Sequence, residues 1–270
     1  MPVVSHHPAR ADFATAASWV APVGALFWII KLVSTAFGEA ASDGLAKQSP
    51  VLAVAVGGLL LVAALLWQLR TRGFVPVRYW TAVAAVAVFG TVLADGVHVV
   101  LGFSYPLTSV LYAAATAAVF WLWHRTEGTL SMHDINTTRR ELFYWAAVMC
   151  TFALGTAVGD LTAATLKLGY WPSVVLFAVA IAVPAIGWRV TGRHEVFWFW
   201  FAYVLTRPLG ASIADGFAKP TSGPHGLGIG DFPVTLDLGI VLAVLIAVAQ
   251  RVYVAQTRDQ LEPSVEVTAR

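Results

Sequence analysis

The chain has 270 residues, of which 58% are hydrophobic and only 12% are charged. This composition excludes an ordinary soluble domain and is typical of a polytopic membrane protein. The net charge of +2 gives no indication of a nucleic-acid partner. The single cysteine, Cys150, excludes an internal disulfide.

Eight segments have the roughly 20 mostly apolar residues that a membrane-spanning helix needs. In chain order they are 21–42, 51–67, 79–101, 107–123, 142–165, 171–190, 196–218 and 234–253. We therefore predict an all-α integral membrane protein with eight transmembrane helices in a single domain over 21–253. Residues 1–20 lack the short apolar core of a signal peptide and are predicted to be an N-terminal segment. Residues 254–270 are predicted to be a short polar tail.

The basic residues predict the orientation of these helices. Twelve of the 17 Lys and Arg fall on one side of an eight-helix arrangement, among them Arg70, Arg139 and Arg251. Lys and Arg are concentrated in the cytoplasmic loops of membrane proteins. Both termini are therefore predicted to be cytoplasmic, in the inner membrane of a bacterium.

A spacing of Trp, Gly and Asp recurs four times, with Gly ten positions after Trp and Asp five positions after Gly. The four sets are Trp28/Gly38/Asp43, Trp80/Gly90/Asp95, Trp145/Gly155/Asp160 and Trp200/Gly210/Asp215. This predicts four two-helix repeats, at about 21–70, 78–124, 142–190 and 196–253. We expect the tryptophans to lie in the inner interfacial belt or to fill contacts between helices. The glycines should let neighbouring helices approach closely.

Because each repeat has two spans, all four repeats point the same way through the membrane. They should be related by rotation about an axis along the membrane normal. Two arrangements remain open: two halves that rock against each other, as in some transporters, or four units around a central axis. In both, the four acids lie at one depth in the outer half of their helices, roughly 22 Å beyond the tryptophans.

The main candidates for function are the repeat acids and the positions one helical turn before them. The acids are Asp43, Asp95, Asp160 and Asp215, and the preceding positions hold Glu39, Thr91, Thr156 and Ala211. A carboxylate inside a bilayer is costly, so it usually faces a bundle interior and marks an ion or proton path. We include Glu39, Thr91 and Thr156 because a purely structural repeat has less reason to vary there. Alternatively, the acids only fix the fold, through hydrogen bonds from loop amides or through ion pairs with Lys31, Lys167, Arg207 or Lys219.

Two groupings could bind a cation. Glu39 lies one turn before Asp43, and His98 follows Asp95 by about one turn. Carboxylate and imidazole groups suit Mn²⁺ or Mg²⁺ if the repeats converge, so these four residues are candidate metal ligands. Clustered carboxylates suit a proton relay equally well. No resident cofactor is predicted, and a divalent metal would be the substrate.

Two cations, Lys31 and Arg207, lie within predicted helices. Pro208 follows Arg207 and is expected to kink its helix. Each cation could pair with a repeat acid inside the bundle, or contact a carboxylate or phosphate of a substrate. Both are therefore candidate internal partners of the acids.

The four Trp/Gly/Asp sets, together with residues 38–43 (GEAASD) and 207–210 (RPLG), resemble a known protein family. It consists of uncharacterised bacterial membrane-anchored proteins built from four tandem two-helix repeats with a characteristic tryptophan. The resemblance covers about 26–253. It implies the fold, but it carries no established activity.

An enzyme is not predicted, because the chain has no nucleophile elbow, phosphate loop or paired His-Glu metalloprotease motif. We predict a transporter of a small ion or metabolite, either a divalent cation or a proton-coupled solute, that works through the repeat acids. The predicted partners are the lipid bilayer and the transported species. The alternative is a structural or partner-binding membrane protein whose acids form ion pairs that lock helices together.

Overall fold

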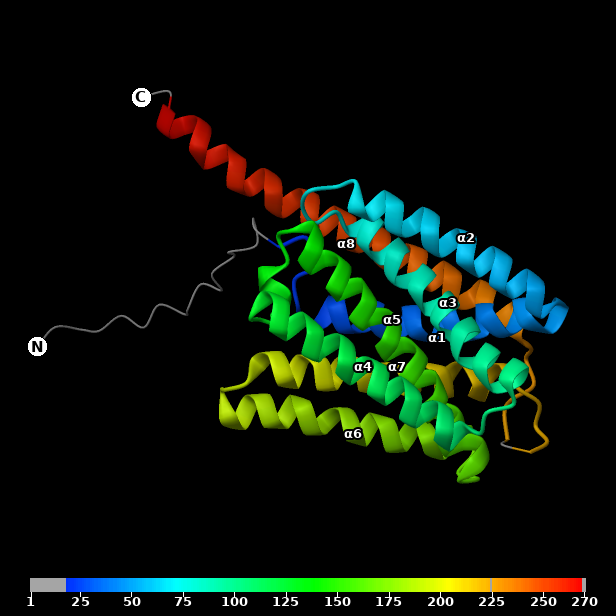
Figure 1. Cartoon of the computed structure of the whole chain (residues 1–270). Coiled ribbons are helices and arrows are strands. Elements are labelled where there is room, and N and C mark those ends of the chain that lie inside the picture. The colour runs from blue at the N-terminus through cyan, green and yellow to red at the C-terminus, as the bar shows by residue number, and fades with distance from the viewer. Residues whose placement is uncertain (1–17, 224, 269–270) are drawn as a thin grey trace, which may run out of the picture.

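The computed structural model describes the backbone of residues 18–223 and 225–268, and side chains as far as residue 258. Within these ranges the chain forms eight long helices and no strand. The helices are α1 (Ala25–Gln48), α2 (Pro50–Leu69), α3 (Pro76–Leu101), α4 (Tyr105–Glu127), α5 (Thr138–Asp160), α6 (Tyr170–Thr191), α7 (Glu195–Ala218) and α8 (Asp231–Thr268) (Figure 1). A 3₁₀ turn, η1 (Met132–Asp134), precedes α5, and a π-helical turn, η2 (Leu161–Thr165), follows it. The predicted all-helical fold is confirmed. Most of the predicted N-terminal segment, 1–17, lies outside the described residues.

Proline and glycine set several helix ends. Pro50 and Pro76 stand in the first turns of α2 and α3, where the missing amide hydrogen would have had no partner. Gly102 and Gly128 follow α3 and α4 with φ of 68° and 72°, a left-handed conformation that glycine adopts without strain. These residues explain why the helices begin and end close to the predicted positions.

Two helices continue six or more residues beyond their predicted C-terminal ends. α1 continues past residue 42 to Gln48, so Asp43 lies inside it. α8 continues to Thr268 through the predicted tail and extends beyond the other helices at one end of the bundle (Figure 1). Neither Gly nor Pro stands between Tyr253 and Glu262. The local sequence therefore gives the helix no reason to stop where the apolar run stops.

The first helices of the four repeats form an inner ring. α1 contacts α3, α3 contacts α5, α5 contacts α7, and α7 contacts α1. Each second helix packs mainly on the inner helix of the next repeat: α2 on α3, α4 on α5, α6 on α7, and α8 on α1 (Figure 1). Of the two arrangements that the sequence leaves open, the structure therefore has four units around a central axis.

The repeat glycines make these contacts close, as predicted. Gly38 packs on Ala87, Gly90 on Phe152, Gly155 on Arg207 and Gly210 on Thr35. A Cβ atom at Gly90 would lie 2.8 Å from the Cβ of Phe152, and one at Gly155 would lie 2.5 Å from the Cβ of Arg207. Each repeat thus touches the next through the same position. The fourth touches the first in the same way.

The aromatic residues beside the repeat tryptophans fill one end of the inner ring. Trp80, Trp145 and Trp200 are buried, so they fill helix contacts and do not form an exposed belt. The hydroxyl oxygens of Tyr79 and Tyr144 lie 2.6 Å apart in the same cluster. This end is closed by packed side chains, and we call it the aromatic end.

Seven of the eight long helices are long and apolar enough to cross a membrane; α7, which carries Arg207 and Asp215, is not among these seven. Seven of the eight predicted membrane-spanning helices therefore meet this criterion. The outer helices turn apolar side chains outward, and Leu59, Val110 and Val179 are 70%, 65% and 64% exposed. The polar side chain of Arg207, by contrast, is buried. The described bundle is therefore apolar on its outer helices and polar along its axis.

Candidate functional site

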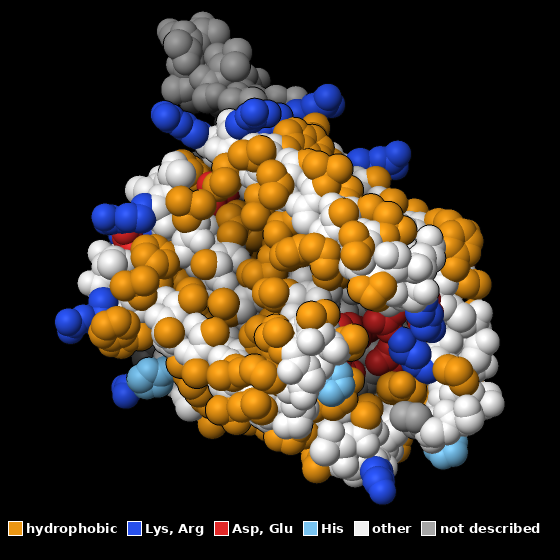
Figure 2. All heavy atoms as spheres, turned by 45° about the vertical axis from the view of Figure 1, so that its right-hand side comes forward, with side chains coloured by type: hydrophobic (Ala, Val, Ile, Leu, Met, Phe, Trp, Pro, Cys, Tyr) orange, Lys and Arg blue, Asp and Glu red, His pale blue; other side chains and the backbone are white. Residues whose placement is uncertain are grey.

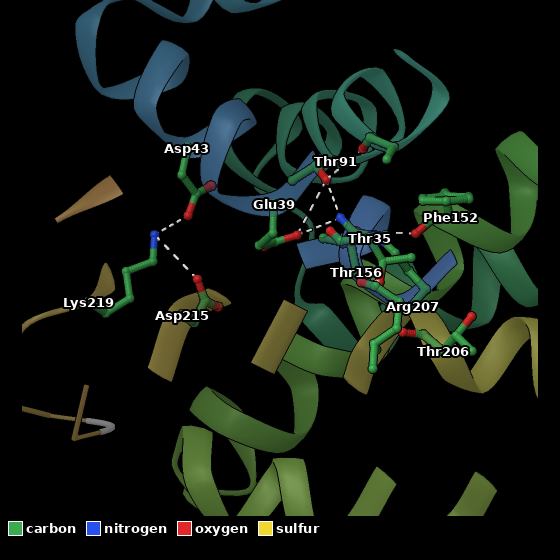
Figure 3. A network of polar contacts seen from close by, with 12 residues as sticks. Thr35, Glu39, Asp43, Thr91, Phe152, Thr156, Thr206, Arg207, Asp215 and Lys219 are labelled. Atoms are coloured by element: carbon green, nitrogen blue, oxygen red, sulfur yellow. Dashed lines mark hydrogen bonds and ion pairs between the residues drawn. The ribbon is translucent and has the colours of Figure 1, made fainter. Parts of the chain in front are cut away.

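The side chain of Arg207 lies at the centre of the inner ring. Its Nη2 atom donates hydrogen bonds to Glu39 Oε2 at 2.5 Å, to Thr156 Oγ1 at 2.8 Å, and to the hydroxyl of Thr91. Its Nη1 atom donates to the carbonyl oxygen of Thr35 at 2.8 Å (Figure 3). Glu39, Thr91 and Thr156 are the candidates that stand one turn before the repeat acids. The structure brings all three together on one guanidinium.

The local sequence explains how this charge fits inside the bundle. Gly155 lacks the side chain that would collide with Arg207, so α5 and α7 can lie against each other there. Arg207 is 1% exposed and Glu39 is 3% exposed. A buried charge needs both a partner and hydrogen bonds, and the two threonine hydroxyls and the Thr35 carbonyl oxygen supply further acceptors, whereas Arg207 Nε has no partner among the described residues. Arg207 thus forms an ion pair inside the bundle, but its partner is Glu39, one turn before Asp43, and not a repeat acid as predicted.

Lys31 has a different environment. It is fully buried, and its Nζ atom has no hydrogen-bond partner in the described part of the chain. The Nζ atom lies 4.1 Å from the centroid of the Phe152 ring and 4.2 Å from that of Tyr203. Both are cation–π distances. Lys31 is therefore held by aromatic faces and not by a repeat acid.

Beyond the arginine, the acids of the repeats gather at the opposite end of the ring, which we call the acidic end. Lys219, the first residue after α7, forms an ion pair with Asp43 and lies 3.7 Å from Asp215 Oδ1 (Figure 3). It also lies 3.6 Å from Asp231 Oδ1, and Lys47 pairs with Asp231 Oδ2. Figure 2 shows acidic side chains grouped beside basic ones at this end of the molecule. One loop lysine thus contacts carboxylates from α1, α7 and α8.

The charges around Lys219 keep it protonated. Burial lowers the pKa of its ammonium group, but the nearby carboxylates of Asp43, Asp215 and Asp231 outweigh this effect and raise the pKa well above the usual range. Opposite charges within about 4–6 Å favour the charged form. Lys219 is therefore a fixed positive charge at neutral pH.

The other two repeat acids have no such partner. Asp95 and Asp160 are half-buried, and among the described residues neither accepts a hydrogen bond nor forms an ion pair. Asp160 is the last residue of α5, directly before the π-helical turn η2. The acidic end therefore holds more carboxylates than cations.

The proposed metal ligands are only partly brought together. In the described part of the chain, ligand atoms of Glu39, Asp43 and Asp215 all lie within 4.8 Å of one another. His98 is engaged elsewhere: its Nδ1 atom lies 2.5 Å from the carbonyl oxygen of Phe103, and its ring stacks on Tyr105. The grouping of acids that the structure supports thus includes Asp215, and the predicted ligands Asp95 and His98 lie outside it.

Three further residues meet at the acidic end, of which Lys219 was a predicted ion-pair partner of the repeat acids, and Lys47 and Asp231 were not. All three lie at helix ends near outer loops, and they meet because the inner ring closes between the first and last repeats. Their separations in sequence are large, 184 residues for Lys47 and Asp231. The sequence signal for Asp231 was the loop after α7: 18 residues separate Asp215 from Pro233, against 7 to 12 from acid to proline in the other repeats, and the loop is rich in glycine and proline.

Glu141 near the start of α5 was also missed. It is fully buried, and its Oε1 atom accepts hydrogen bonds from Gln68 Nε2 at 3.0 Å and Trp145 Nε1 at 3.4 Å. It follows Arg139 and Arg140, so the sequence indicated a solvated loop. Glu141 lies at the aromatic end and is separate from the acidic cluster.

Comparison with known families gives one match. The sequence profile of a family described as “Repeat of Unknown Function (DUF347)” matches residues 26–74, 78–129, 143–194 and 198–253. The four consecutive matches confirm the resemblance to a four-repeat family. No curated protein and no solved structure matches the chain.

Proposed function

The chain belongs to this repeat family of unknown function, and we propose that it is an integral membrane protein that transports a small cation or protons through the acids of its four repeats. All eight long helices would span the bilayer, with the acidic end outside and both chain termini in the cytoplasm. The distribution of Lys and Arg supports this orientation.

The surface of the bundle supports the membrane location. Rows of exposed Leu and Val on the outer helices match an environment of lipid tails. α7 fits the same picture although it is less apolar, because Arg207 and Asp215 are buried inside the ring. Polar residues inside membrane proteins usually face the bundle interior in this way.

The observation that carries the transport proposal is the excess of carboxylates at the acidic end. Asp43, Asp215 and Asp231 share two lysines, and Asp95 and Asp160 have no basic partner among the described residues. Carboxylates left unpaired in such a place take up protons or cations. The site would therefore bind positive charge from the outer side and release it when the ring rearranges.

The buried cations support a carrier over an open channel. Below the acids, the axis is occupied by the guanidinium of Arg207 and then by the ammonium of Lys31, packed against Phe152. A fixed positive charge in a pore is a barrier to cations. Movement past these residues would need a change in the arrangement of the inner helices.

The test is flux into liposomes reconstituted with the purified protein and loaded either with a pH-sensitive dye, which reports protons, or with a dye that responds to divalent cations. Inward cation or proton movement is measured for the wild type and for Asp160→Asn, with Asp134→Asn as the control because Asp134 is exposed in η1. We expect Asp160→Asn to remain folded and lose most of the flux, and Asp134→Asn to keep it. Wild-type liposomes without any cation or proton flux would contradict the transport proposal.

A specific observation favours a structural role as the second candidate. The peptide chain links the first repeat to the second, the second to the third and the third to the fourth, but nothing covalent links the fourth directly back to the first. Three ion pairs cross this junction: Arg207–Glu39, Lys219–Asp43 and Lys47–Asp231. They could serve only to close the ring. In that case single neutral substitutions of these acids would unfold the protein, and the folded wild type would show no flux.

A further inference from the structure

Lys219 occupies a pocket built from three carboxylates. Its ammonium forms an ion pair with Asp43 and lies 3.7 Å from Asp215 Oδ1 and 3.6 Å from Asp231 Oδ1. The three acids come from α1, α7 and the first turn of α8. Its side chain is only 19% exposed. A primary ammonium ion is thus the group that this pocket holds in the structure.

One carboxylate of the pocket has an unused hydrogen-bonding atom. Asp231 is 6% exposed, and its Oδ1 atom has no hydrogen-bond partner among the described residues. That atom points toward Lys219 Nζ from 3.6 Å, which is too far for a hydrogen bond. A buried acceptor without a donor costs about 1–3 kcal/mol. The Oδ1 atom of Asp231 therefore lacks a hydrogen-bond donor even with Lys219 in the pocket.

The loop after α7 holds Lys219 over the pocket. Amides of Leu227, Ile229 and Gly230 donate hydrogen bonds to carbonyl oxygens at the end of α7, at 2.8, 3.1 and 3.0 Å. The amide of Gly228 donates to the carbonyl oxygen of Lys219 itself at 2.8 Å. The loop is therefore folded back on the helix end. Lys219 is thereby held next to the three acids at a high effective concentration.

We propose that Asp43, Asp215 and Asp231 form a binding site for a small primary ammonium ion, and that Lys219 fills this site as a tethered competitor. The inference rests on the proposed function and names the ligand class of the same acidic end. An incoming ammonium ion would replace the lysine by a group of the same charge and hydrogen-bonding capacity. It could also be placed to donate to Asp231 Oδ1.

A divalent metal fits this place less well. The group of acids close enough to share a metal ion is Glu39, Asp43 and Asp215. Glu39 Oε2 is already bound by Arg207 at 2.5 Å. A metal ligated by Glu39 would therefore compete with Arg207 for the charge of the same carboxylate. Exchange of one ammonium for another leaves the arginine pair intact.

The test uses Lys219→Met, which keeps an unbranched side chain of similar length and removes the charge. The purified full-length variant and the wild type are heated in detergent with increasing methylammonium chloride, at constant ionic strength. We expect a saturable rise of the unfolding midpoint of the variant. The wild type should need at least roughly tenfold more methylammonium, because a tethered competitor acts at millimolar or higher effective concentration.

Two controls separate this effect from general ionic effects. Tetramethylammonium has the same charge but no N–H donor, so it should not raise the midpoint of Lys219→Met. Lys47→Met removes a lysine that is 58% exposed and whose one ion pair among the described residues is with Asp231, so this variant should respond like the wild type. If folded Lys219→Met is obtained only when methylammonium is present from solubilisation onward, that result would also support the proposal, because it shows that methylammonium stabilises the folded variant.

Two results would overturn the inference: no response of Lys219→Met to methylammonium, or an equal response to tetramethylammonium. Failure to recover folded Lys219→Met with or without methylammonium would count against it as well. Other outcomes test the proposed function separately from this inference. If Mn²⁺ or Mg²⁺ stabilises the variant while methylammonium does not, the ligand class is wrong and cation transport stands. If wild-type liposomes move no cation or proton, transport itself is wrong.

Discussion

Lys31 and Arg207 contact the same aromatic ring, that of Phe152, but only Arg207 has a carboxylate partner. The distances to the ring centroid are 4.1 Å from Lys31 Nζ and 5.4 Å from Arg207 Cζ. Arg207 shares its charge with Glu39 and two threonine hydroxyls. For Arg207, pairing with a carboxylate offsets the cost of burying the charge, whereas for Lys31 no carboxylate does so. Their replacement by methionine should have opposite effects on stability.

Arg207→Met should lower the free energy of unfolding by about 3–5 kcal/mol, because it leaves Glu39 buried without its cation. The measurement is the unfolding midpoint in detergent, with Arg139→Met as the control, since the Arg139 side chain is 70% exposed and such a pair contributes about 0–1 kcal/mol. The double variant with Glu39→Gln should lose less than the sum of the single variants. Strict additivity of the two losses would show that the pair is not coupled.

Lys31→Met should leave the unfolding midpoint unchanged or raise it. An ammonium without a counter-ion in the interior costs several kcal/mol in desolvation, whereas its cation–π contacts return about 2 kcal/mol. Methionine keeps the packing against Phe152 and Tyr203. A fall in the midpoint as large as that of Arg207→Met would mean that Lys31 has a partner whose contribution exceeds its desolvation cost.

Gly90→Ala should destabilise the protein by about 1–3 kcal/mol, the usual cost of overpacking. The new methyl group would lie 2.8 Å from Phe152 Cβ in the contact between α3 and α5. Gly96→Ala is the matched control, because Gly96 is in the same helix and a Cβ there meets no atom within 4 Å. It should be neutral or stabilising by up to about 1 kcal/mol. Equal midpoints for the two variants would contradict the close contact.

The stability that Lys219 contributes should disappear at high pH. Its folded-state pKa is raised above the value of about 10.4 that is usual for lysine, so its contribution is complete at neutral pH. It decreases as the pH rises from about 10.4 toward the folded-state pKa. The difference in midpoint between the wild type and Lys219→Met should therefore be constant from about pH 7 to 9 and shrink above about pH 10. A difference in midpoint that grows with pH would contradict a raised folded-state pKa of Lys219.

The fold was largely predictable because it rests on periodic features. Apolar runs of sufficient length gave all eight helices, and the Trp/Gly/Asp spacing gave the four repeats. The structure adds that Gly38 and its equivalents contact the next repeat in turn, which selects a ring. The choice between a ring and two rocking halves depends on which helix faces which neighbour. That information is not local in sequence.

The candidate site was predictable in part. Glu39, Thr91 and Thr156 were identified because they share a position in the repeat, and they do meet on Arg207. Lys219 was named as a possible ion-pair partner of the acids, whereas Lys47 and Asp231 were missed because they stand outside the repeated pattern. They join the acids only when the ends of the chain come together. His98 lies near Asp95 in sequence, but the turn after α3 directs it to the carbonyl of Phe103.

The glycine contacts have a consequence for how an asymmetric centre arises. Head-to-tail contacts that close after four steps are those of a cyclic tetramer. Four identical two-helix subunits would have to place the same side chain at the axis four times, as four arginines or four glutamates, and like charges would repel. In a single fused chain each position can diverge separately. Gene fusion thus permits one Arg207 to face one Glu39 and two threonines within a nearly symmetric frame.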